Sequence, residues 1–100
     1  MSSVQDAVKV APDIYKVLLE NDAVRVIEIQ MKRGGKSAMH SHPKCVVYML
    51  TNSKTKFTFP DGKSENVDLK AGETIWLDPT SHSVENTGDE MRGLLVELKK

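Results

Sequence analysis

Apolar residues recur at every second position along most of the chain, which is the period of a β-strand with one face buried. In the run Lys56-Phe57-Thr58-Phe59, for example, both phenylalanines fall on one face of an extended chain. Glycine, asparagine, aspartate and proline interrupt these segments at intervals of roughly eight to twelve residues. The pattern predicts an all-β sandwich or barrel with little room for helix.

About eight strands are expected from this pattern. They cover residues 14–20, 23–31, 40–51, 54–59, 65–69, 74–77, 81–85 and 93–98. Turn-forming pairs such as Gly34-Gly35 and Asn52-Ser53 separate several of them, which favours hairpin connections. In segment 23–31 the apolar positions change parity after Val26, which indicates either a bulge near that residue or burial of both faces.

The chain is predicted to form one domain, because 100 residues suffice for one modest core but not for two. Residues 1–12 carry scattered apolar side chains and are expected to form an N-terminal arm or a short helix. Residues 13–100 are then the barrel domain.

Charge and cysteine content narrow the function classes. With 14 basic and 14 acidic residues the net charge is zero, and no basic stripe suits the phosphates of nucleic acid or of an acidic membrane. Cys45 is the single cysteine and has no partner for an internal disulfide. No apolar run approaches the roughly 20 residues that cross a bilayer, and no leader pattern opens the sequence. A cytoplasmic protein without nucleic acid or membrane partners is expected.

The three histidines form the candidate site. His40 and His42 are two residues apart, so in a strand both imidazoles project from one face and can converge on one ion. His82 can supply a third nitrogen, and neutral imidazole suits iron, nickel, zinc and copper alike. The alternative is that the His-x-His pair faces solvent in a polar loop while His82 caps a turn.

Two spaced motifs carry a family resemblance. Gly34 followed by His40-x-His42 resembles the first half of cupin motif one, and Gly72 followed by His82-Ser-Val-Glu-Asn86 is similar to motif two. The chain looks like the small single-domain cupins of about this length, including short cupins described as β-alanine degradation proteins. The resemblance implies a jelly-roll β-barrel, also called a double-stranded β-helix, with His40, His42 and His82 as metal ligands.

One departure from the cupin pattern changes the expected chemistry. The glutamate of motif one would fall at Val46 or Val47, and neither side chain can bind a metal. A site of three neutral imidazoles leaves a divalent ion with its full charge and open positions, which favours anionic, bidentate ligands. Cupins with three histidines include ferrous dioxygenases that act on diketones or thiols, so Fe(II) is the first expectation, with nickel, zinc, copper or manganese as alternatives.

Other residues are weaker candidates. Tyr48 shares strand parity with the histidines, so without a bulge its hydroxyl would point into the barrel and act as a catalytic donor, although a core tyrosine is the alternative. Trp76 is expected in the core or on the pocket wall. Asp78 either orients a ligand histidine or forms a turn. Cys45 has the opposite parity and is expected outside the site.

Three functions remain open at this point. The chain is a metal-dependent oxygenase acting on a small chelating substrate, a binding module for a small molecule or metal without catalysis, or a metal-dependent isomerase or lyase. For an isomerase or lyase, the sequence offers no evident general base beside the histidines. Open sheet edges favour a homodimer, with the N-terminal segment as a candidate for lying across the partner.

Overall fold

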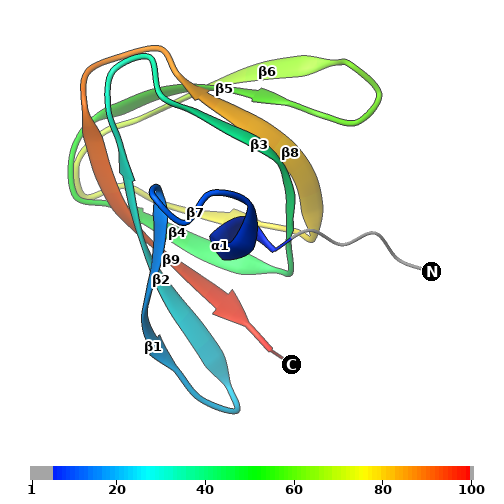
Figure 1. The fold of residues 1–100 in the computed structure, drawn as a ribbon. Coiled ribbons are helices and arrows are strands. Elements are labelled where there is room, and N and C mark those ends of the chain that lie inside the picture. The colour runs from blue at the N-terminus through cyan, green and yellow to red at the C-terminus, as the bar shows by residue number, and fades with distance from the viewer. Residues whose placement is uncertain (1–5, 100) are drawn as a thin grey trace.

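The structure is a computed structural model that describes residues 6–99. One short helix precedes nine strands (Figure 1). The elements are α1 (Ala7–Val10), β1 (Tyr15–Glu20), β2 (Val24–Met31), β3 (Lys36–His42), β4 (Cys45–Met49), β5 (Ser53–Thr58), β6 (Ser64–Leu69), β7 (Thr74–Leu77), β8 (Thr80–Asn86) and β9 (Met91–Leu98). The expected all-β jelly roll is confirmed, with nine strands where the pattern predicted eight.

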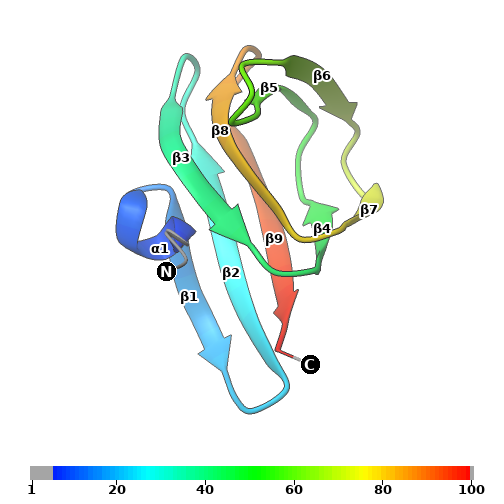
Figure 2. The ribbon, with the colours of Figure 1, turned by 90° about the vertical axis from the view of Figure 1, so that its right-hand side faces the viewer.

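The strands form two antiparallel sheets that face one another (Figures 1 and 2). One sheet has five strands in the order β1-β2-β9-β4-β7, and the other has four in the order β3-β8-β5-β6. Sequence neighbours β3 and β4 therefore belong to different sheets. The two histidine-bearing strands, β3 and β8, pair directly with each other.

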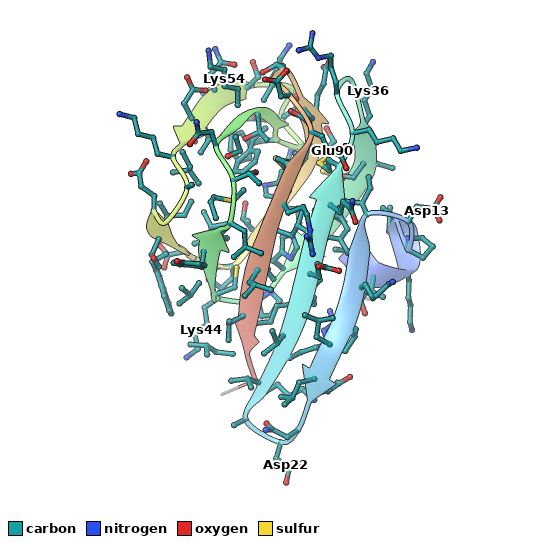
Figure 3. The ribbon with its side chains drawn as sticks, turned by 90° about the vertical axis from the view of Figure 1, so that its left-hand side faces the viewer. Asp13, Asp22, Lys36, Lys44, Lys54 and Glu90 are labelled. Atoms are coloured by element: carbon teal, nitrogen blue, oxygen red, sulfur yellow. The ribbon has the colours of Figure 1, made fainter. Side chains whose placement is uncertain are left out.

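The inner face of the five-stranded sheet supplies most of the apolar core. Its side chains include Ile27, Ile29, Val47, Met49 and Leu95, all buried. The four-stranded sheet contributes fewer apolar groups and more polar ones, because its buried residues include Ser37, Thr55 and all three histidines. Most charged side chains lie at the periphery, where Figure 3 labels six of them, and Glu97 is a buried exception. Burial of polar groups is thus concentrated on one side of the interior.

The predicted strand 40–51 is wrong as a single element, because it divides at Pro43 and Lys44 into β3 and β4. Proline has no N–H to donate to a ladder and occurs mainly at strand ends and edges. After it the chain leaves one sheet and enters the other. Alternation of side chains therefore restarts at Cys45, and parity counted from the histidines no longer holds.

Two bulges adjust the strands around the site. The register of β3 against β8 shifts between Ser37 and His40, so that buried Ser37 and buried His40 face the same interior although they are an odd number of positions apart, three. The bulge expected near Val26 lies instead on the neighbouring strand, where β1 shifts between Val17 and Leu19 while β2 pairs continuously with β9. Val26 faces outward from the five-stranded sheet and is half-buried.

The N-terminal segment packs on its own barrel. Asp6 caps α1 by accepting a hydrogen bond from the Val8 amide, and Ala7 is completely buried against the core. Asp6 also forms a β-bridge with Ser41, which stands between two of the histidines. The part of the expected arm at residues 1–5 lies outside the described residues. Among those described, no helix is long and apolar enough to cross a membrane.

Candidate metal centre

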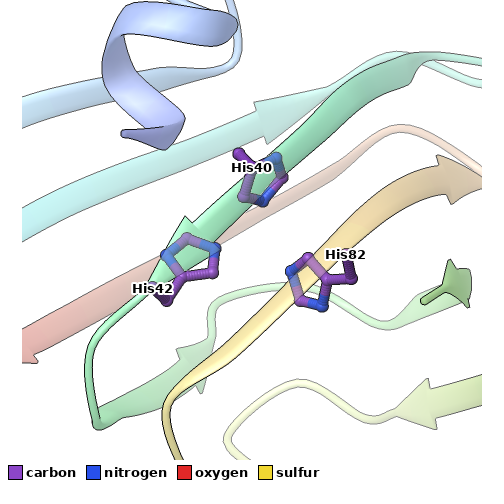
Figure 4. Close-up of side chains that lie close together, drawn as sticks. All are labelled: His40, His42 and His82. Atoms are coloured by element: carbon purple, nitrogen blue, oxygen red, sulfur yellow. The ribbon is translucent and has the colours of Figure 1, made fainter. Parts of the chain in front are cut away.

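The three histidines meet in the interior, where Figure 4 shows their rings facing one another. His40 and His82 are direct partners in the β3–β8 ladder, and His42 follows His40 on the same face. One ring nitrogen from each residue lies within 4.8 Å of the others. The ring centroids are 4.7 to 5.3 Å apart. Two adjacent strands thus bring together the residues that the motif spacing predicted.

Hydrogen bonds determine which nitrogens are free to bind an ion. His40 Nδ1 lies 2.8 Å from the carbonyl oxygen of Ala38, in the bulge of β3, so Nδ1 donates and Nε2 keeps its lone pair. His40 Nε2 and His82 Nδ1 are buried and have no hydrogen-bond partner among the described residues. Orphaned buried nitrogens are costly unless something binds them. This arrangement fits a metal ion.

Burial keeps two of the rings neutral. The pKa of His40 is lowered to about 4 and that of His82 to about 3, mainly by loss of solvation, with a smaller contribution from the neighbouring histidines. At neutral pH these rings therefore carry no proton that an ion would have to displace. Their exposed fractions, 0% for His40 and 3% for His82, agree with that cause.

A partly buried network of charged side chains lies beside His42. Its Nδ1 is 3.1 Å from Glu97 Oε2, and the other carboxylate oxygen of Glu97 accepts from Arg25 Nε at 2.9 Å. Arg25 also donates two parallel hydrogen bonds to Asp6, at 2.8 and 2.7 Å. The guanidinium holds the pKa of Asp6 below its usual value, and these carboxylates raise that of Arg25.

Apolar groups surround His82 on the opposite side. The ring of Phe57 lies 4.4 Å from that of His82, measured between centroids. An inner cavity of about 50 Å³ reaches His42 and His82, and an outer cleft of about 440 Å³ reaches His82. Phe57, Ile75 and Leu77 line both spaces, and Glu65 and Asp78 also line the outer cleft. The cleft is the side from which a small molecule can approach the histidines.

The expected inward orientation of Tyr48 is wrong. Its side chain is 42% exposed on the outer face of the five-stranded sheet, while Cys45, Val47 and Met49 point inward. The cause is the break at Pro43, which resets the alternation, so the geometric basis for a catalytic Tyr48 is lost. Cys45 is correspondingly buried in the core, and burial raises the pKa of its thiol to about 12.

Of the two places expected for Trp76, the structure supports the pocket wall and not the core. The residue lines the outer cleft, and 49% of its surface is exposed. Asp78 accepts a hydrogen bond from the Trp76 indole at 2.9 Å, an interaction the sequence analysis did not foresee. Asn86 has a structural role, because its side-chain amide nitrogen lies 2.9 to 3.2 Å from three backbone carbonyl oxygens.

Sequence reasoning gave no role to Glu97, Arg25 or Asp6. A signal existed for the first two, because both occupy inward positions of strands whose other inward residues are mostly apolar: Glu97 follows Leu95, and Arg25 precedes Ile27. A charged residue at a core position needs a partner, and two such residues of opposite charge predict each other. Asp6 carried no comparable pattern.

Several solved structures with this fold are cupins. A cupin domain from Bordetella pertussis Tohama I is 25% identical over 100% of both chains, with a TM-score of 0.80. An RmlC-like cupin protein from Desulfovibrio desulfuricans is 17% identical over 99% of this chain and 95% of that one, with a TM-score of 0.64. An RmlC-like cupin family protein with a double-stranded β-helix fold from Methanocaldococcus jannaschii is 15% identical over 85% of this chain and 78% of that one, with a TM-score of 0.66.

Sequence comparison adds nothing to these structural matches, since no family model and no curated protein matches the chain. The structural likeness spans the whole chain, and it agrees with the two motifs around His40, His42 and His82. The chain has the cupin fold, and its structural neighbours match a small single-domain cupin.

Proposed function

We propose that His40, His42 and His82 hold a divalent transition metal, with Fe(II) as the first candidate and nickel, zinc, copper or manganese as alternatives. The observation that carries this proposal is the pair of buried, unpartnered nitrogens, His40 Nε2 and His82 Nδ1, inside a group of three imidazoles. Such nitrogens are ligands for borderline metals and poor ones for calcium or magnesium.

We further propose that the site is that of an oxygenase acting on a small chelating substrate such as a diketone, enolate or thiol. A bound ion would supply Lewis acidity and a position for oxygen. The residues of this chain would then hold the ion, bind the substrate and shield both from water. Three neutral ligands leave the charge of the ion unbalanced, which favours an anionic chelating head, and the mostly apolar lining of the inner cavity favours an uncharged body.

The second candidate is a binding module without catalysis. The small inner cavity favours it, because about 50 Å³ has room for roughly three waters beside the histidines. An isomerase or lyase would need a general base in that space. Apart from the histidines, Tyr15 is the one titratable side chain among the residues that line the inner cavity, and burial raises its pKa to about 12. That observation disfavours an isomerase or lyase.

The test is elemental analysis of untagged protein together with the His42→Ala variant. We expect near-stoichiometric iron in the wild type after reconstitution with Fe(II), and its loss in the variant while the circular dichroism spectrum is unchanged. Oxygen uptake with a panel of diketones and thiols then separates an oxygenase from a binding module. Absence of metal in the reconstituted wild type would refute the metal centre. Bound iron without oxygen uptake would favour the binding module.

We also propose that the protein forms a homodimer through the outer face of the five-stranded sheet. The strand registers align one apolar row across all five strands: Leu19, Val26, Val96, Val46 and Trp76. Leu19 and Trp76 are each about half exposed, at 50% and 49%. Such a continuous apolar strip on a sheet face is typical of an interface.

A second copy is the proposed occupant because the polar rim of this strip is self-complementary. Lys16, Glu28 and Arg92 flank it with both signs of charge, so two copies related by a two-fold axis need not repel each other. Sedimentation at micromolar concentration is expected to show a dimer that Val96→Lys converts to a monomer. Ser83→Lys, on the outer face of the other sheet, is the matched control and should remain dimeric. A monomeric wild type would refute this interface.

A further inference from the structure

The network behind His42 connects the candidate metal centre to the N-terminal segment. Glu97 stands on β9 with 3% of its surface exposed, and both of its carboxylate oxygens are used. Oε2 faces His42 Nδ1, and Oε1 accepts from Arg25, whose Nη2 also lies 2.7 Å from it. Arg25 in turn donates two further hydrogen bonds to the carboxylate of Asp6. Glu97 is therefore held from one side and faces the imidazole with the other.

A carboxylate at this position determines which nitrogen of His42 is protonated. An ionised carboxylate is an acceptor only, so its partner Nδ1 carries the proton and Nε2 keeps the lone pair. The same result is reached at His40 by a different group, the carbonyl oxygen of Ala38. Two of the three histidines thus present Nε2 as the ligand atom for structural reasons.

The network also adds negative charge next to the centre. Two carboxylates, Asp6 and Glu97, share one guanidinium, Arg25, which leaves one net negative charge. No residue of motif one provides such a charge, because Val46 and Val47 stand where its glutamate would be. Glu97 delivers it from β9, one imidazole away from the place of the ion. A carboxylate in this relation to a ligand histidine orients the ring and raises its basicity.

We propose that Glu97, held by Arg25 and Asp6, is the positioning residue of the metal centre: it selects the Nδ1–H form of His42 and compensates part of the charge of the ion. The proposal rests on the proposed metal function for its effect on affinity. Its effect on the ring of His42 exists in the metal-free protein as well.

The first experiment is ¹⁵N NMR of the imidazoles in the metal-free protein at neutral pH. Wild-type His42 is expected in the Nδ1–H form. In Glu97→Gln the amide oxygen is expected to stay with Arg25, so that the amide NH₂ faces His42 and donates to Nδ1. His42 should then change to the Nε2–H form, while His40, whose partner is Ala38, keeps its own form.

The second experiment is competition titration of Co²⁺ and Zn²⁺ in the same proteins. Glu97→Gln is expected to weaken metal binding by about 10- to 100-fold and to shift the visible spectrum of the Co²⁺ form. Glu28→Gln is the matched control, because it removes a glutamate that also pairs with an arginine, on the outer face of β2. That control should change neither the spectrum nor the affinity.

The outcomes separate the two proposals. An unchanged His42 form in Glu97→Gln, or wild-type metal affinity in that variant, overturns the role of Glu97 even where metal binds. A changed His42 form in a protein that binds no metal supports the positioning role and refutes the proposed metal function. Should Glu97→Gln fail to fold, the wild-type spectrum still decides, because an Nε2–H form of His42 there contradicts the proposal.

Discussion

His42 and His82 lie on opposite flanks of one small centre, in opposite surroundings. The ring of His42 is backed by a buried carboxylate, a guanidinium and a second carboxylate. The ring of His82 is backed by Phe57 and has a buried nitrogen without a partner. The first flank is closed by hydrogen bonds, and the second opens into a cleft of about 440 Å³.

This difference indicates that the surroundings of His42 and of His82 have different roles. On the closed side, polar groups fix the orientation of the His42 ring. On the open side the groups beside His82 are mostly apolar, which suits the entry of a small molecule under the proposed function. Each of the following substitutions acts on one flank and leaves the other intact.

Removing the cation of the polar flank should have the largest effect on stability. Arg25→Met leaves Glu97 buried without a positive partner, so we expect the free energy of unfolding of the metal-free protein to fall by about 3 kcal/mol. Urea denaturation measures this. Arg92→Met, which breaks an exposed pair with Glu28, should cost less than about 1 kcal/mol. Equal costs for both variants would mean that the polar flank is not an ionic unit.

Removing each histidine in turn should distinguish the flanks in the metal-free protein. His42→Ala leaves an oxygen of Glu97 without its donor, whereas His82→Ala removes a nitrogen that had no partner. The first substitution should therefore cost about 1 to 3 kcal/mol more than the second, measured by urea denaturation. Both variants should lose metal binding. A greater cost for His82→Ala would reverse the assignment of the flanks.

Changing the apolar flank should affect stability without affecting the ion. Phe57→Leu keeps an apolar group beside His82 but loses the ring contact, so we expect a loss of about 1 kcal/mol in unfolding free energy. Metal affinity, measured by competition titration, should be close to that of the wild type. A loss of affinity as large as that of Glu97→Gln would show that the two flanks do not have separate roles.

The smallest effect is expected at the far end of the network and depends on pH. The pKa of Asp6 is lowered from its usual 3.8 in the folded protein, mainly by the hydrogen bond from Arg25. Its stabilising contribution is therefore present above about pH 4 and is lost as the pH falls through the folded pKa. Asp6→Asn, which can still cap α1, should cost about 1 kcal/mol or less at pH 7. Urea midpoints from pH 7 to 2 should converge for the two proteins at the acidic end, and a difference that persists there would exclude the ionic origin.

Much of the centre was predictable because its geometry is local to strands. His40 and His42 needed only the two-residue period, and the motif spacing to His82 indicated the rest. The period of the apolar residues likewise predicted most strands to within a few residues. These features depend on short stretches of chain, where sequence and structure correspond directly.

The predictions that were wrong or missing concern features that the alternation of residues within a strand does not encode. Alternation cannot be counted through Pro43, where the chain changes sheets, so Tyr48 was assigned to the wrong face. The bond between Glu97 and His42 joins residues 55 positions apart on different sheets, and no local pattern pairs them. The inward charges at Arg25 and Glu97 would have predicted an ion pair, but not that it ends at a histidine.

The place of β9 in the five-stranded sheet has a consequence for the order of events in the cell. This strand is translated after the other eight, yet it pairs between β2 and β4, which have no other connection within their sheet. A ribosome-bound chain that lacks β9 has already displayed all three histidines, but it has two unpaired strand edges and no carboxylate behind His42. Those edges are therefore open to pairing with other chains until β9 emerges, and the carboxylate of Glu97 reaches His42 only after β9 is translated.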